Sequence, residues 1–96
     1  MMSFDEENTM ICEQGMEAEA NKNIDKAIEL YESLLERRFD GTHPYRSLCE
    51  IYHKQKRFKD EIRVIKALKK VTPSWRYKEA DKYRWYDKRL AELSKR

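Results

Sequence analysis

The sequence contains few residues that interrupt regular secondary structure. Its 96 residues include two glycines, two prolines and two cysteines. Collagen-like and low-complexity chains need far more Gly and Pro, and β-sandwiches need many more turn residues. Charged residues make up 41% of the chain, and its aromatic share of 11% is higher than disordered chains carry. We therefore expect one small all-α domain over residues 1–96.

Long apolar runs and cysteine pairs are also missing. The first twenty residues carry six carboxylates and no apolar run long enough for a signal peptide or a membrane span. Cys12 and Cys49 are 37 positions apart and form no CxxC pair, whereas a small secreted domain usually carries more cysteines. We expect a cytoplasmic protein with reduced thiols and no membrane partner.

Charge is divided unevenly along the chain. Residues 1–41 hold 4 Lys and Arg against 11 Asp and Glu, a net charge of −7. Residues 42–96 hold 17 against 7, a net charge of +10. The total of +3 hides this difference. Opposite charges on the two halves suggest that copies could pair head-to-tail or as an antiparallel homodimer.

Apolar spacing predicts five helices. Ser3 with Glu6 forms a capping box for the first helix, which runs to about Ala20, and Asn23 caps the second. Apolar residues recur at three- and four-residue steps in every segment. The residues expected to face inward in the first helix are Phe4, Ile11, Gly15 and Ala18.

Further signals mark the other boundaries. Phe39-Asp40-Gly41 ends the second helix, with Gly41 suited to a left-handed C-terminal cap. Thr42 or His43 caps the third helix, and Pro44 stands in its first turn. Lys56-Arg57 separates the third helix from a fourth helix that begins at Phe58. A last helix covers about 74–95.

The chain repeats itself at 34 residues. This shift places the first two helices on the third and fourth, so that apolar residues fall on apolar residues although few identities are shared. The matched pairs include Ile11 with Tyr45, Gly15 with Cys49, Ile24 with Phe58, Ile28 with Ile62, Tyr31 with Ile65 and Leu34 with Leu68. A helix–turn–helix unit of this length is that of a tetratricopeptide repeat.

The motif of that family appears in the second copy. Tyr45-x2-Leu48-Cys49-x2-Tyr52 resembles the family's Trp-x2-Leu-Gly-x2-Tyr, with a small residue where paired helices approach closely. Ala27-x3-Tyr31 resembles the Ala-x3-Phe of the second helix, and Pro73 closes the second copy. The pattern departs from the family at Glu61, where alanine is expected, and at Phe39, where proline is expected.

The resemblance implies a fold and a surface. The fold is a five-helix right-handed α-α superhelix with repeat one at about 8–41, repeat two at about 42–73 and a capping helix at about 74–95. The alternative is an unrelated five-helix bundle. First helices of such repeats line a concave groove that binds a peptide or a helix. Mapped onto this chain, the groove consists of Thr9, Cys12, Glu13, Met16, His43, Arg46, Ser47, Glu50, His53, Lys54, Tyr77, Asp81, Arg84 and Lys88.

The same mapping excludes one known binding mode. Family members that clamp a peptide C-terminal carboxylate use Lys and Asn where this chain has Cys12, Met16 and Ser47. The sequence therefore predicts a protein-interaction module or adaptor without that clamp.

Catalytic and metal motifs are sparse. Glu50-x-x-His53 is half of a di-iron motif that needs two copies, and only one is present. His43 and His53 are ten residues apart on one helix, about 15 Å, too far to share an ion. The sequence has no phosphate-binding loop or nucleophile elbow. We expect no enzyme activity, no cofactor and no metal.

The C-terminal third supports an alternative function. Trp75-Arg76-Tyr77-Lys78 and Tyr83-Arg84-Trp85-Tyr86 interleave basic and aromatic residues, as single-stranded nucleic-acid surfaces do. Helical spacing turns Tyr83 and Tyr86 towards the core with Leu90, which leaves chiefly Trp85 exposed for stacking. Nucleic-acid binding is therefore the second hypothesis.

Overall fold

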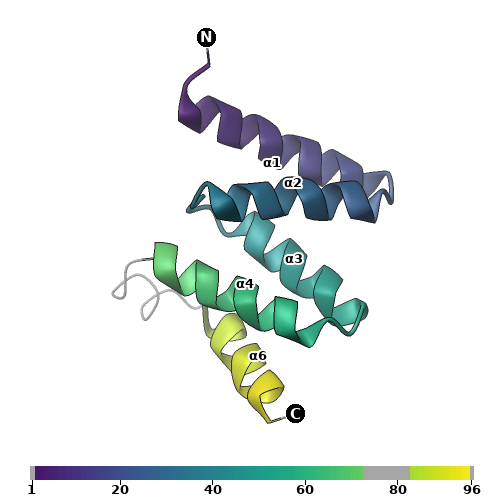
Figure 1. Ribbon diagram of the computed structural model, residues 1–96, viewed down its shortest axis with the longest axis vertical. Helices are drawn as coiled ribbons and strands as arrows, with labels where there is room; N and C mark the ends of the chain where they lie inside the picture. The colour runs from purple at the N-terminus through teal and green to yellow at the C-terminus, as the bar shows by residue number, and fades with distance from the viewer. Residues whose placement is uncertain (1, 73–82, 96) are drawn as a thin grey trace.

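The computed structural model describes residues 2–72 and 83–95, which form five helices and no strand (Figure 1). The helices are α1 (Phe4–Ala20), α2 (Ile24–Glu36), α3 (His43–Lys54), α4 (Phe58–Val71) and α6 (Arg84–Ser94). Each packs against the next described helix, so α1 lies at one end of the molecule and α6 at the other (Figure 1). The predicted all-α class is confirmed. Only the later part of the expected last helix lies within the described residues.

Local capping sets the helix starts. Ser3 Oγ accepts the backbone N–H of Glu6 at 3.2 Å and contacts the Glu6 carboxylate at 3.2 Å. Asn23 Oδ1 accepts the N–H of Lys26 at 3.4 Å. Ser3 and Asn23 thus cap their helices as predicted, but the capping box is half formed, because the Glu6 carboxylate accepts from the Ser3 hydroxyl and not from the Ser3 backbone N–H. Thr42 occupies the N-cap position of α3, but its side chain makes no capping hydrogen bond.

The helix ends repeat with the period of the sequence. Lys22 after α1 and Lys56 after α3 both adopt left-handed backbone, with φ of 62° and 60°. The next residue in each case donates its N–H back into the helix, Asn23 to the Ala18 carbonyl and Arg57 to the Tyr52 carbonyl, both at 2.8 Å. Such bonds satisfy carbonyls that the helix end leaves free. The 34-residue period is therefore present in the backbone geometry as well as in the apolar pattern.

The predicted cap at Gly41 is wrong. Helix α2 ends at Glu36, and Arg38 takes the left-handed conformation with φ of 56°. Phe39 then donates its N–H to the Leu34 carbonyl at 3.0 Å. No described glycine has positive φ. The backbone reversal is completed before the chain reaches Gly41, which lies in the connection to α3.

The core contains residues from every helix described. Its members are buried and apolar: Ala18, Ala27, Tyr31, Leu34, Tyr45, Leu48, Cys49, Tyr52, Val64, Ile65, Leu68, Tyr83, Tyr86 and Leu93. Gly15 is buried as predicted and faces the Tyr31 ring. Phe4, predicted to face inward, is 56% exposed. It stands in the first turn of α1, where the Arg37 guanidinium covers its ring at 4.4 Å.

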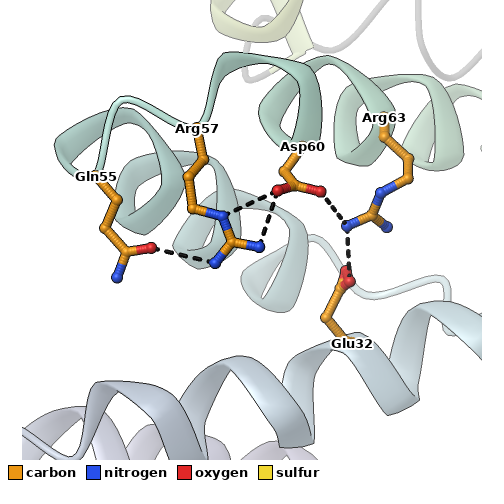
Figure 2. Close-up of polar contacts among 5 residues, drawn as sticks. All are labelled: Glu32, Gln55, Arg57, Asp60 and Arg63. Atoms are coloured by element: carbon orange, nitrogen blue, oxygen red, sulfur yellow. Dashed lines mark hydrogen bonds and ion pairs between the residues drawn. The ribbon is translucent and has the colours of Figure 1, made fainter.

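A polar network ties α2 to α4 outside this core. Figure 2 shows Arg63 donating to Glu32 at 2.8 Å and to Asp60 at 3.2 Å. Asp60 also accepts from Arg57 at 2.9 Å, and Arg57 donates to Gln55 at 3.3 Å. Burial raises the pKa of Asp60, but the hydrogen bonds from Arg63 and Arg57 outweigh it and leave that pKa below its ordinary value. The network links helix α2 to helix α4.

Candidate functional site

Three helices meet at the hydroxyl of Tyr31. This hydroxyl donates to Glu19 of α1 at 2.6 Å and lies 3.4 Å from Nε2 of His43 on α3. Ser47 Oγ lies 3.3 Å from the same histidine nitrogen. Tyr31 is fully buried, and burial together with the bond to Glu19 raises its pKa. A neutral tyrosine thus holds α1, α2 and α3 in one arrangement.

A groove opens beside this cluster. It has a volume of about 300 Å³ and is lined by Glu19, Ile24, Ser47, Glu50, Ile51, Lys54 and Gln55. We call it the α1–α3 groove. Its wall offers carboxylates and an amine, while Ile24 and Ile51 supply apolar surface. A lining that mixes polar and apolar groups suits a peptide, because the peptide backbone needs hydrogen bonds and its apolar side chains need apolar surface.

Of the six residues that the sequence predicts on α3, Ser47, Glu50 and Lys54 line the groove, whereas His43, Arg46 and His53 do not. His43, Glu50 and Lys54 are exposed, Arg46 and His53 are half-buried, and Ser47 is buried at the floor. Arg46 donates to Glu50 at 2.8 Å one turn along the helix. The six predicted α3 residues therefore lie on one side of the helix, although they differ widely in exposure.

The α1 positions separate into two groups. Glu13 and Met16 are exposed, whereas Cys12 is half-buried and packs against the core. Burial, with the nearby Glu13 charge, raises the pKa of the Cys12 thiol. Thr9 is exposed, and its hydroxyl donates to the Asp5 carbonyl at 3.0 Å. Glu13 and Met16 remain candidates for partner contact, and Cys12 contributes to packing.

His53 joins a buried carboxylate instead of Glu50. Its Nδ1 lies 2.9 Å from Oε1 of Glu61, a side chain with no exposed surface. The other oxygen of Glu61 accepts from Arg89 of α6 at 2.7 Å. Glu61, which departs from the repeat pattern, thus connects α3, α4 and α6. The sequence around Glu61 does not reveal its contact with Arg89, because Arg89 lies 28 residues further along the chain.

The C-terminal residues of the predicted groove are only partly described. Tyr77 and Asp81 lie outside the described residues, while Arg84 and Lys88 are exposed on α6. Trp85, predicted to be an exposed ring, is half-buried. The guanidinium groups of Arg46 and Arg89 lie over its ring at 3.7 and 4.6 Å, and Tyr86 meets it edge-on at 4.9 Å. Trp85 therefore joins α6 to α3, which corrects the prediction.

Comparison with known proteins adds no assignment. The chain matches no protein-family model, no curated protein and no solved structure. Within residues 2–72 and 83–95, no helix is long and apolar enough to cross a membrane.

Proposed function

We propose that this chain is a cytoplasmic, non-enzymatic interaction module that binds a peptide or helix of another protein in the α1–α3 groove. In this proposal the two hairpins, α1–α2 and α3–α4, are tetratricopeptide-like repeats of a right-handed α-α superhelix, and α6 belongs to the cap. The observation that carries it is the groove itself. Exposed groups of α3 stand above a floor that Tyr31, Glu19 and Ser47 hold in place.

The rigidity of this floor supports a binding role. Tyr31 contacts two neighbouring helices, through Glu19 of α1 and His43 of α3. A wall fixed before binding reduces the conformational entropy lost on association. The polar groups of the floor contact one another: Tyr31 contacts Glu19 and His43, and His43 contacts Ser47. Because Ser47 and His43 are engaged in these contacts, we assign them a positioning role and not a nucleophilic one.

The experiment compares two charge-exchange variants that leave the net charge unchanged. Glu50→Lys with Lys54→Glu alters the groove wall, and Glu36→Lys with Lys66→Glu alters exposed positions elsewhere. Affinity purification followed by titration calorimetry should find a protein that binds wild type and the control variant with similar Kd. The groove variant should lose about tenfold or more in affinity. Equal binding by all three chains would refute a role for the groove.

Nucleic-acid binding through the C-terminal basic residues is the alternative. The stacking of Arg46 and Arg89 on Trp85 weighs against it, because those ring contacts would have to be broken before a base could stack there. Fluorescence anisotropy with single-stranded oligonucleotides separates the two functions. Binding that weakens by about 0.7 log units per phosphate contact for each log unit of salt, and that Arg84→Ala reduces, would favour the alternative.

A further inference from the structure

The solvent side of α1 exposes large apolar side chains. Met10 and Met16 on the helix are 40% and 47% exposed, and Met2 just before it is 42% exposed. All three lie away from the side that carries the buried Asn8, Gly15 and Ala18. Single exposed apolar residues are ordinary, but a group of them on one helix indicates an interaction surface. Methionine suits such surfaces because its flexible thioether adapts to different partners.

The same side of α1 is acidic without compensation. Asp5, Glu6, Glu13 and Glu17 are exposed, and none forms a salt bridge with another residue that the structure describes. Helix α1 contains no Lys, Arg or His. Glu13 and Glu17 stand one turn apart, where like charges repel. Glu17 also lies in the last turn, where the helix dipole disfavours negative charge. Helix stability accounts for Asp5 and Glu6, which stand in the first turn, but not for Glu13 and Glu17.

A shallow hollow combines the two features. Its volume is about 400 Å³, and it is lined by Met2, Asp5, Glu6, Thr9, Met10 and Glu13. Apolar thioethers thus lie beside carboxylates within one depression. A ligand that covers the methionines brings its own charged groups next to these carboxylates, and only cationic groups would be attracted there.

We propose that the methionine- and carboxylate-bearing side of α1 docks a basic amphipathic helix of a partner protein. The partner would place an apolar stripe on Met2 and Met10 and Lys or Arg side chains beside Glu6 and Glu13, all of which line this hollow. This inference rests on the proposed function only in taking the chain to be an interaction module, because the hollow shares no residue with the α1–α3 groove. An acidic or uniformly polar peptide does not fit.

The test uses the full chain and three fluorescent peptides. The probe is a helical peptide of about 18 residues with a leucine stripe and lysine elsewhere, long enough to form a helix. One comparison peptide carries glutamate in place of lysine, and the other has the same leucines and lysines in an order that destroys the stripe. We expect the probe to bind about tenfold or more tightly than either, with an affinity that falls as salt is added.

Matched variants locate the binding site. Glu6→Gln, Glu13→Gln and Glu17→Gln together should weaken probe binding about tenfold, and so should Met2→Ser, Met10→Ser and Met16→Ser together. Asp25→Asn, Glu29→Gln and Glu36→Gln remove the same charge from exposed positions on α2 and should change Kd by less than about twofold. Circular dichroism melts verify that each variant is folded. Equal weakening by the α2 control would overturn the proposal.

The groove variant separates this inference from the proposed function. Loss of the probe with the α1 variants but not with Glu50→Lys and Lys54→Glu supports docking on α1, and the groove is then judged by its own partner-binding assay. Loss with the groove variant alone supports the groove and overturns docking on α1. Loss with neither set of variants overturns docking on α1.

A second copy of the chain is the remaining occupant. Its basic half would have to cover the α1 side in a head-to-tail contact. Light scattering without probe tests this arrangement. A wild-type monomer at low salt supports the proposal, whereas self-association that salt and the Glu→Gln variant abolish would overturn it.

Discussion

Arg89 of α6 donates a 2.7 Å hydrogen bond to Glu61 of α4, a carboxylate with no exposed surface. The same carboxylate lies 2.9 Å from His53 of α3. In the tetratricopeptide pattern that the sequence resembles, the position of Glu61 is a small alanine. Here it is a glutamate, which pairs with Arg89 of α6. A residue that departs from the repeat pattern thus attaches α6 to the rest of the fold.

Replacing Arg89 alone should destabilise the fold more than replacing Arg89 and Glu61 together. Arg89→Met leaves Glu61 buried without its main cation, and we expect a loss of about 3 kcal/mol in the free energy of unfolding. Combining Arg89→Met with Glu61→Leu should restore most of that loss, because apolar groups replace the buried charges. Urea unfolding followed by circular dichroism measures both. Equal losses in the single and double variants would contradict a coupled pair.

Gly15 provides the space for Tyr31. A Cβ at this position would lie 2.5 Å from Cε1 of Tyr31, inside van der Waals contact. Gly15→Ala should therefore lower stability by about 1–3 kcal/mol, although alanine favours a helix by about 1 kcal/mol. Gln14→Ala at the exposed neighbouring position is the control and should not destabilise. A thermal melt in which Gly15→Ala raises Tm would show that the ring moves aside easily.

Acid should weaken the network around Asp60. Its pKa in the folded protein lies below the ordinary carboxyl value because Arg63 and Arg57 outweigh burial. A lowered folded pKa adds stability above the unfolded pKa of about 4, and this stability is lost as pH falls through the folded pKa. Urea unfolding at several pH values between about 6 and 3 should show a shallower loss for Asp60→Asn than for wild type. Parallel profiles would assign the acid sensitivity to other carboxyls.

The two cysteines should differ in reactivity. Cys49 is fully buried, and burial with the nearby Glu61 charge raises its pKa to about 12. Cys12 is only half-buried. Since the thiolate is the reactive form, a disulfide reagent should label Cys12 in the native protein and Cys49 only after unfolding. Cys12→Ser and Cys49→Ser identify each thiol. Fast native labelling of the Cys12→Ser variant would show that the core opens readily.

Local sequence signals predict the helices of this chain. Ser3 and Asn23 cap their helices because a side-chain oxygen reaches a backbone N–H three residues away, a distance that needs no knowledge of the fold. The exposed positions of α3 follow from helical spacing in the same way. The left-handed residue after α2 was missed because glycine is the usual signal for that conformation, whereas Arg38 adopts it here.

The candidate site depends on contacts that spacing does not reveal. Glu19 was absent from the predicted groove, because its partner Tyr31 follows twelve residues later on another helix. Trp85 was expected to be exposed from its spacing on α6. This spacing does not reveal that Arg46 of α3 covers the ring. Both errors concern side chains whose surroundings come from a different helix.

The all-α class, the 34-residue period and the acidic character of α1 can be read from the amino acids alone, since each depends on residue type and on spacing along the chain. The sharing of Glu61 by His53 and Arg89, the contacts of Tyr31 with α1 and α3 and the position of Trp85 beneath two guanidinium groups are known only from the folded arrangement. These two sets of features differ in the range of the interactions that produce them. Helix formation acts within a few residues, whereas burial and charge pairing depend on which helices the folded chain brings together.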